Sequence, residues 1–312
     1  MLRGPAAIER AAAILRDGRL VGMPTETVYG LAGDAADPVA VARIFAAKGR
    51  PRFNPLISHV ASLQLTEAEG MLDERAAALA EAFWPGPLTL VVPVAPTART
   101  CELARAGLGT IALRIPGHPV AQALLEAFGG PVSAPSANPS GRLSPTRPED
   151  VARELGAEVG MVLDGGPCAA GIESSIVSLL PEDPPRLLRP GAIARAHIEA
   201  LVGSLAEPDR EGVTAPGQLA SHYAPRAALR LEAAQAREGE TLLGFGLGAP
   251  PDAANLSPSG DTVEAAANLY RMLREIDAGG AATIAVMPIP EEGLGEAVND
   301  RLRRAAAPRP DG

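Results

Sequence analysis

One basic residue stands apart in the sequence as a candidate for chemistry. Lys48 is the only lysine among 28 basic residues, and every other one is arginine. A lysine ammonium is a compact charge with three rotatable donors, whereas a guanidinium is a wide planar fork, so a tight polyphosphate pocket can need the first and exclude the second. Further polar residues follow it closely: Arg50, Arg52, Asn54 and His59. We therefore predict that residues 48–59 and the polar run at 24–30 form the floor of an anion-binding site.

Two later stretches add groups of the same kind. Arg114 ends the apolar run 111–113, and an arginine buried at a strand end is costly unless an anion meets it. Residues 132–141 (VSAPSANPSG) hold small hydroxyls and an amide between prolines, which predicts a rigid loop whose donors are placed before a ligand arrives. Both stretches favour recognition of a carboxylate or a phosphate.

Each of these features also has a simpler explanation. Lys48 could survive by chance at a helix end, where a cation favours the C-terminal dipole. His59, on or just past a strand, could be a buried histidine with ordinary hydrogen bonds. Arg114 could form an internal salt bridge with one of the 37 acidic residues, and residues 132–141 could be an ordinary turn. The case for a site therefore depends on whether these groups meet in space.

The elements expected around these residues alternate between helix and strand up to about residue 200, which predicts an α/β fold. Pro5 stands in the first turn of one helix, and Asp37 is the expected N-cap of another. The expected helices cover 5–16, 38–47, 74–83 and 119–128. The expected strands cover 20–23, 56–60, 88–94, 110–114, 161–164, 174–180 and 187–188.

Residues 205–227 have a composition typical of a linker. They contain His222 and Tyr223, and a linker that carries an imidazole and a phenol can fold over a site as a lid. The tail is expected to form a smaller α/β unit with strands at 229–231, 241–245 and 283–287, a helix that begins with the capping box 261–264, and a last helix at 295–306. We therefore predict a first domain at 1–204, a linker or lid at 205–227 and a C-terminal domain at 228–312.

Several function classes are disfavoured. A net charge of -9 has the wrong sign for general nucleic-acid binding, so any RNA contact would have to be local or shared with a partner. Cys101 and Cys168 lie far apart and outside any C-x-x-C, which argues against a disulfide framework or a zinc site, and no G-x-x-x-x-G-K-[ST] motif is present. Without an apolar run of about 18 residues or a leader pattern, we expect a cytoplasmic protein with no membrane partner.

Taken together, these motifs resemble a known family. Five of them occur in order: 24–30, Lys48-x-Arg50 with 54–56, Ser136-x-Asn138, 189–191 and 222–225. This set is similar to the Sua5/YrdC/YciO family, and the linker with a C-terminal unit resembles its long, Sua5-type form. The resemblance implies a YrdC-like twisted mixed-sheet catalytic domain followed by a smaller, Rossmann-like α/β domain, the Sua5 domain.

The resemblance also implies an activity. Members with this organisation are nucleotidyltransferases that convert L-threonine, bicarbonate and ATP into threonylcarbamoyl-AMP and pyrophosphate, the precursor of the t6A37 modification of tRNA. The product passes to tRNA threonylcarbamoyl transferase proteins, and a weak contact with tRNA or double-stranded RNA would fit the fold. Mg²⁺ would be held mainly by phosphate oxygens and water, so no protein metal ligands are expected. An RNA-binding relative without chemistry and a carbamoyl-adenylating transferase are the alternatives.

Carried over by position, the resemblance implies two sets of binding residues. L-threonine would be held by Thr27, His59, Arg114, Ser136 and Ser174 or Ser175. ATP would be held by Lys48, Arg50, Asn54, Thr110, Asn138, Ser144, Arg189, His222 and Tyr223. The catalytic set would be Lys48, Arg50, Ser136 and Asn138. The reaction asks mainly for positioning and charge neutralisation, because carboxylated threonine itself attacks the α-phosphate.

Overall fold

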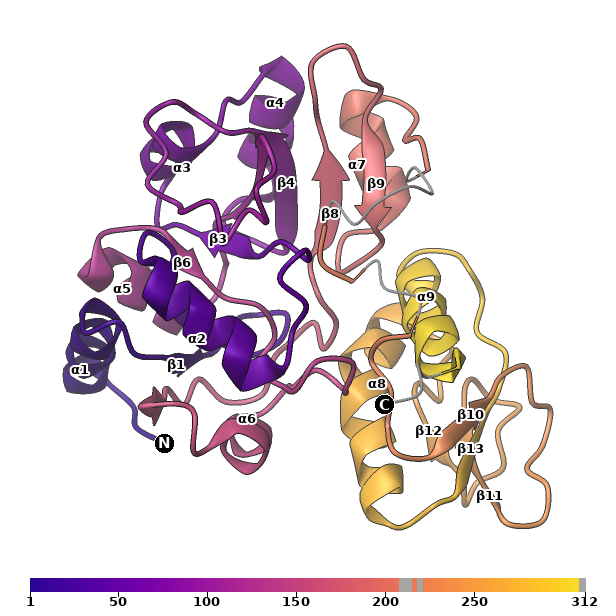
Figure 1. The fold of residues 1–312 in the computed structure, drawn as a ribbon. Helices are drawn as coiled ribbons and strands as arrows, with labels where there is room; N and C mark the ends of the chain where they lie inside the picture. Colours follow the sequence, from indigo (N-terminus) through magenta and orange to yellow (C-terminus); the bar gives the residue numbers. More distant parts are fainter. Residues whose placement is uncertain (208–214, 218–220, 309–312) are drawn as a thin grey trace.

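The computed structural model describes residues 1–207, 215–217 and 221–308. Over these residues the chain forms two separate sheets flanked by helices, so the predicted α/β fold with a large mixed sheet and a second small sheet is confirmed (Figure 1). Parts of the predicted linker, 208–214 and 218–220, lie outside the described residues, as do the last residues, 309–312. None of the described helices has the length and apolar character needed to cross a membrane.

The first sheet contains nine strands among the described residues, in the order β7-β1-β2-β6-β3-β5-β4-β8-β9. Its strands are β1 (Val21–Met23), β2 (Gly30–Asp34), β3 (Ile57–His59), β4 (Leu88–Pro93), β5 (Thr110–Arg114), β6 (Val132–Ser133), β7 (Met161–Val162), β8 (Ser175–Ser178) and β9 (Arg186–Arg189). Its helices are α1 (Pro5–Arg16), α2 (Pro38–Lys48), α3 (Leu63–Glu69), α4 (Glu74–Phe83), α5 (Pro119–Phe128), α6 (Pro148–Leu155) and α7 (Arg195–Val202). Parallel and antiparallel pairs both occur, so the sheet is mixed.

Strand pairing brings distant polar residues together. β3 and β5 are parallel, and their register sets His59 directly beside Arg114. β6 runs antiparallel to β3 on its other side, so the loop that follows β6 starts beside Ile57, at the beginning of β3. The pairing of three neighbouring strands therefore brings the polar residues of β3 and β5 close to the loop after β6.

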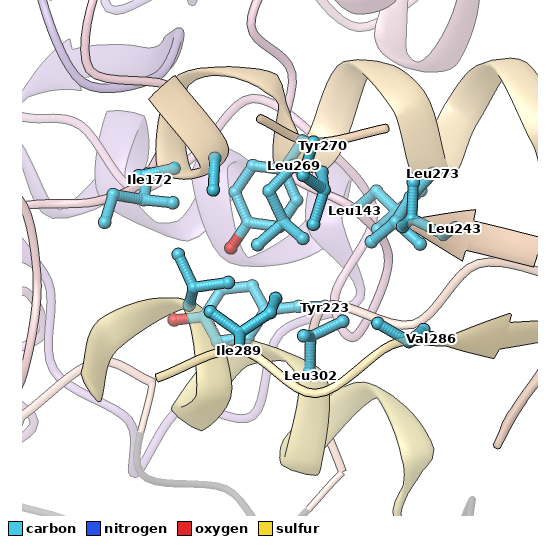
Figure 2. Close-up of a cluster of buried hydrophobic side chains, with 14 of the residues drawn as sticks. Leu143, Ile172, Tyr223, Leu243, Leu269, Tyr270, Leu273, Val286, Ile289 and Leu302 are labelled. Atoms are coloured by element: carbon cyan, nitrogen blue, oxygen red, sulfur yellow. The ribbon is translucent and has the colours of Figure 1, made fainter. Parts of the chain in front are cut away.

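The second sheet is all parallel, in the order β10-β13-β11-β12. It consists of β10 (Ala228–Arg230), β11 (Glu240–Gly244), β12 (Ala254–Asn255) and β13 (Thr283–Val286), with helices α8 (Thr262–Ala278) and α9 (Gly295–Ala306). These two helices lie on the side of the small sheet that faces the rest of the chain (Figure 1). One buried hydrophobic cluster crosses between the two parts, because Leu143, Ile172 and Tyr223 pack with Leu269 and Tyr270 of α8 (Figure 2).

Several elements were not predicted from the sequence. The missed strands and helices are β2, β6, β12, α3, α6 and α7. β2 has the sequence GLAGD, which carries little β propensity, and it is a strand because β1 and β6 pair with both of its edges. β6 occupies the first two residues of the expected rigid loop 132–141, so the loop itself begins two residues later than predicted.

The predicted helix starts are confirmed in one case and only half correct in another. Asp37 caps α2 by accepting a hydrogen bond from the backbone N–H of Val39 at 2.8 Å. Asp261 caps α8 in the same way through Val263, at 2.7 Å. The reciprocal half of the capping box is absent, because the Glu264 carboxylate accepts from Ser257 instead and the Asp261 N–H donates to the Ser257 hydroxyl.

Candidate active site

A small buried cavity lies beside β3, β5 and the loop after β6. Its volume is about 50 Å³, which holds a few water molecules. Its lining comes from the turn after β1, the exit of α2, β3, β5, the loop after β6, the approach to β8, β9 and residues 216–217 and 222–223. A larger and mostly apolar cavity of about 700 Å³ lies between α3 and α4, and none of the predicted site residues lines it.

Lys48 lies at the end of α2 and is turned inward. Its ammonium donates to the backbone carbonyls of Ser136 and Asn138, each at 2.5 Å, and only 4% of the residue is exposed. Burial and the nearby Arg50 lower the pKa of Lys48 well below its ordinary value. The lone lysine is therefore attached to the loop after β6 and does not serve as a surface cation. Arg52, its predicted neighbour, is exposed.

Arg50 is fixed by the turn that follows it. Its guanidinium donates to the Asn54 side-chain oxygen at 2.6 Å and to the Pro55 carbonyl at 2.8 Å. Burial lowers the pKa of Arg50 to about 10. Asn54 therefore orients Arg50, which lines the cavity, while Asn54 itself lies behind it.

Arg114 and His59 form the other end of the cavity. Arg114 donates to the Thr27 hydroxyl at 2.9 Å and forms an ion pair with Glu26 at 2.7 Å, so the internal salt bridge weighed as an alternative exists. Arg114 nevertheless lines the cavity together with Thr27 and His59. Burial and the charge of Arg114 lower the pKa of His59 to about 3, so its imidazole is neutral at physiological pH. Its Nδ1 is buried without a hydrogen-bond partner among the described residues.

The two adjacent serines before and in β8 face different surroundings. The Ser174 hydroxyl lies 2.8 Å from that of Thr89, accepts from Arg189 at 3.1 Å and lines the cavity. The Ser175 hydroxyl donates to the Ile193 carbonyl at 2.7 Å and is not part of the lining. Successive strand residues point to opposite faces, which explains the difference.

The remaining residues predicted to hold ATP are arranged less uniformly. Arg189 is buried, lines the cavity and donates to the Ser174 carbonyl at 2.9 Å. Asn138 and Ser144 lie in the loop after β6, outside the lining, and the side-chain oxygen of Asn138 is buried without a partner among the described residues. Thr110 begins β5, about 13 Å along the strand from Arg114, and the structure does not bring it to the cavity.

A buried carboxylate at the cavity was missed by sequence analysis. Glu173 is 5% exposed and accepts hydrogen bonds from Ser144 at 2.5 Å and from Arg301 at 2.8 Å. Although burial raises its pKa, the charges of Arg301 and Arg189 outweigh burial and lower the pKa of Glu173 to about 2. Tyr270 of α8 donates to the same carboxylate. No signal in the sequence marked it, because it is one of 37 acidic residues.

The lid residues predicted in the linker are folded into the site. His222 and Tyr223 are buried and line the cavity, with ring centroids 4.0 Å apart. Tyr223 has a φ of 62°, in the left-handed region, and its hydroxyl is buried without a partner among the described residues. Gly217 lies so close that a Cβ there would approach this hydroxyl to 2.6 Å, so glycine is required for this closed arrangement.

The site carries an excess of positive charge. Three buried cations, Lys48, Arg50 and Arg189, donate to carbonyl, amide or hydroxyl oxygens and have no ion pair among the described residues. The nearby acids Glu26 and Glu173 are each paired with another arginine. Such an arrangement suits a polyanion that supplies the missing negative charge.

Comparisons with known proteins show the family of the chain. A family model described as "Telomere recombination" (Sua5_yciO_yrdC) matches residues 13–191, and one described as "Threonylcarbamoyl-AMP synthase, C-terminal domain" (Sua5_C) matches residues 193–307. The chain belongs to the Sua5/YciO/YrdC family. Its two matched segments together give the long, Sua5-type organisation predicted from the sequence, and that prediction is confirmed.

Relatives match over nearly the whole chain. The chain is 39% identical to a protein of Bacillus subtilis named threonylcarbamoyl-AMP synthase, over 97% of this chain and 93% of that one. The crystal structure of P. abyssi Sua5 complexed with L-threonine superposes with a TM-score of 0.88, at 37% identity, over 98% of this chain and 96% of the other. A variant of P. abyssi Sua5 with an adjacent histidine and tyrosine replaced by alanine gives a TM-score of 0.85 at 37% identity, over 96% and 92%.

Proposed function

We propose that this protein is an L-threonylcarbamoyladenylate synthase that makes threonylcarbamoyl-AMP and pyrophosphate from L-threonine, bicarbonate and ATP. The observation that carries the proposal is the meeting of Arg50 and Arg189 with Thr27, Arg114 and Ser174 around one buried cavity, with Lys48 bound behind it to the carbonyls of Ser136 and Asn138. Lys48, Arg50 and Arg189 have no ion pair among the described residues and supply positive charge for a triphosphate, whereas Thr27, Arg114 and Ser174 supply polar groups for an amino acid. The name of the Bacillus subtilis relative supports the same reaction.

The threonine end of the site is formed by the Arg114 side of the cavity. Arg114 binds the substrate carboxylate, while Thr27 and Ser174 hold its polar groups. Neutral His59 accepts a hydrogen bond from the substrate ammonium or hydroxyl, because its Nδ1 has no partner among the described residues. Between Ser174 and Ser175 we assign Ser174, whose hydroxyl faces the cavity. The P. abyssi structure, solved with L-threonine, supports a threonine site in this fold.

The nucleotide end is formed by the Lys48 side. Lys48 and Arg50 neutralise the phosphates, with Ser136 and Asn138 positioned by Lys48 through their carbonyls. Ser144 and Arg189 complete this side with Asn54, which orients Arg50. Carboxylated threonine attacks the α-phosphate in line and pyrophosphate leaves, so the chain contributes positioning and charge neutralisation and no covalent nucleophile. Thr110 is the weakest member of the set because it starts β5 away from the cavity.

The closed cavity requires a movement during turnover. A volume of about 50 Å³ cannot admit ATP, so residues 216–217 and the lid pair His222 and Tyr223 must move aside when substrate enters. His222 and Tyr223 are also the only adjacent histidine and tyrosine in this chain. The P. abyssi variant that replaces such a pair is the precedent for testing them.

Mg²⁺ fits this site as an ion carried by ATP. Within the parts of the chain that the structure describes, no group of three or more His, Cys, Asp and Glu residues could hold a metal, and Glu173 is committed to Arg301. Phosphate oxygens and water would supply the ligands, and the ion would stabilise charge on the leaving pyrophosphate. The adenylate serves t6A37 formation on tRNA in the cytoplasm, where a tRNA threonylcarbamoyl transferase receives it.

A pyrophosphate-release assay tests the proposal. Release from ATP should require both L-threonine and bicarbonate, and the adenylate should appear by mass spectrometry. D-threonine serves as the matched control because it presents the same groups with the wrong geometry. Release that is independent of threonine refutes the proposal. Release supported by carbamoyl phosphate in place of threonine and bicarbonate would favour a carbamoyl-adenylating transferase, and salt-sensitive RNA binding without release would favour an RNA-binding relative.

A further inference from the structure

Arg301, on α9 of the C-terminal part, is 1% exposed and contacts the site in three ways. Its Nε donates to the Glu173 carboxylate at 2.8 Å, and its second terminal nitrogen donates to the Pro190 carbonyl, next to Arg189, at 3.0 Å. Its guanidinium carbon also lies 4.9 Å from the centre of the Tyr223 ring. One side chain of the C-terminal part therefore contacts the residue after β9, Glu173 before β8, and the lid residue Tyr223.

The lid tyrosine is held mainly by the C-terminal part. Its ring contacts the Arg301 guanidinium and lies near the Tyr270 ring, whose centroid is 5.9 Å away, and Figure 2 shows the hydroxyl ends of the two tyrosines pointing to the same side. The preceding residue, His222, donates its backbone N–H to the Arg304 carbonyl of α9 at 3.2 Å. Residues of α8 and α9 therefore contact Tyr223 and the backbone next to it, while Tyr223 lines the cavity.

Arg301 is itself fixed by a closed set of polar contacts. The Glu173 carboxylate accepts from both Arg301 and the Tyr270 hydroxyl, and Asp300 binds the other terminal nitrogen of Arg301 at 2.6 Å. A guanidinium buried over an aromatic face gains a cation–π attraction that is stronger without water. A lysine could keep the charge but could not form all of these contacts at once, because it lacks the planar fork.

We propose that Arg301 is a positioning residue for the reaction: it holds the Tyr223 ring over the nucleotide end of the cavity, and by this contact the C-terminal domain acts on ATP binding. The inference rests on the nucleotide site proposed above. A domain that only stabilised the fold would need buried apolar contacts, which the shared cluster already provides. The Arg301 contacts also fix the orientation of the Tyr223 side chain, and this reaction requires groups that are oriented around the phosphates.

The test uses the full-length protein with the variant Arg301→Lys and the control Arg303→Lys. Arg303 lies on the same helix, and its side chain is 60% exposed and paired with Glu291. Arg301→Lys should raise the KM for ATP about tenfold while the Kd for L-threonine stays within about twofold. The control should leave both values unchanged. If Arg301→Lys lowers only the folded fraction and leaves the ATP KM unchanged, the proposal is wrong.

A double-variant cycle with Tyr223→Ala identifies the route. If Arg301 acts through the lid tyrosine, Arg301→Lys should not weaken ATP binding further once that ring is gone, and additive effects would contradict the proposal. ATP affinity is measured by calorimetry as well as by turnover. A wild-type protein that binds ATP but releases no pyrophosphate would therefore refute the proposed reaction and leave this comparison valid.

A milder variant covers the case in which Arg301→Lys does not fold. Tyr270→Phe keeps the ring and removes only the hydroxyl that donates to Glu173 at 3.0 and 3.1 Å. A Glu173 carboxylate that has lost this hydrogen bond should hold Arg301 less rigidly, and we expect the KM for ATP to rise about threefold. An unchanged ATP KM in folded Tyr270→Phe would overturn the proposal.

Discussion

The variant Lys48→Arg keeps the positive charge at the nucleotide end of the site and changes its shape. The ammonium fits between two carbonyls, each 2.5 Å away, in surroundings that leave 4% of the residue exposed. A guanidinium is longer and wider, so it must displace the loop that carries Ser136 and Asn138. Overpacking of this kind costs about 1–3 kcal/mol.

The larger effect is expected on turnover. Loss of one well-placed donor to a charge that develops in the transition state lowers kcat about 100- to 1000-fold, or about 3 kcal/mol. We expect Lys48→Arg to lower kcat/KM for ATP by about this factor and the thermal unfolding temperature by a few degrees. The affinity for L-threonine should change little, because Arg114 lies at the other end of the cavity.

The assay is pyrophosphate release at saturating threonine and bicarbonate, with threonine affinity measured by calorimetry on the same samples. Arg52→Lys is the matched control, because it makes the reverse exchange at an exposed position on the same turn. The control should keep wild-type activity. If folded Lys48→Arg retains kcat/KM within about threefold of wild type, the shape of the cation is irrelevant and the argument from the lone lysine fails.

Two further predictions concern the buried histidines and the adjacent serines at β8. Because burial lowers the pKa of His59 and of His222 to about 3, the folded state binds fewer protons than the unfolded state below the ordinary pKa, so stability is lost as pH falls below about 6.5. Between pH 7.5 and 5.5 each histidine should lower the free energy of unfolding by about 1.4 kcal/mol. His222→Gln should remove about half of the combined loss from the two histidines, measured by urea unfolding. An unchanged dependence of stability on pH in this variant would contradict the burial of a neutral His222. Ser174→Ala should weaken threonine binding about tenfold by calorimetry, whereas Ser175→Ala should leave it unchanged and lower stability by about 1 kcal/mol. A stronger effect of Ser175→Ala on threonine would reverse our choice between them.

Local signals in the sequence were sufficient for the elements with strong ends. Helix α2 was predicted because Asp37 and Pro38 begin it, and in the structure Gly49 ends it with a φ of 59°. β5 was predicted because it contains the apolar run 111–113. Strand β2 was missed because its glycines and alanine carry no such signal, and β6 was missed because it has only two residues and pairs with strands far away in the chain.

The polar residues at the cavity were predictable where the residue type itself was unusual. A lone lysine and a histidine with a tyrosine in a linker are rare enough to be noticed without coordinates. Glu173 was not noticeable, because one of 37 acidic residues carries no mark of burial. Its role depends on Arg301, 128 positions away, and on Tyr270, and no local pattern links these residues.

The distribution of ion pairs explains why the one lysine stands where it does. Arg114 forms an ion pair with the partly buried carboxylate of Glu26, and Arg301 with the buried carboxylate of Glu173; a planar fork suits such a partner. Lys48 meets two carbonyl oxygens that converge on one point, which a single nitrogen with three donors can satisfy while one donor remains for a ligand. An overall charge of -9 would oppose the approach of a triphosphate, so binding depends on local cations that form no ion pair within the described part of the chain. The protein therefore pairs Arg114 and Arg301 with carboxylates, and it leaves Lys48, Arg50 and Arg189 without an ion pair among the described residues, where we expect a polyanion to bind.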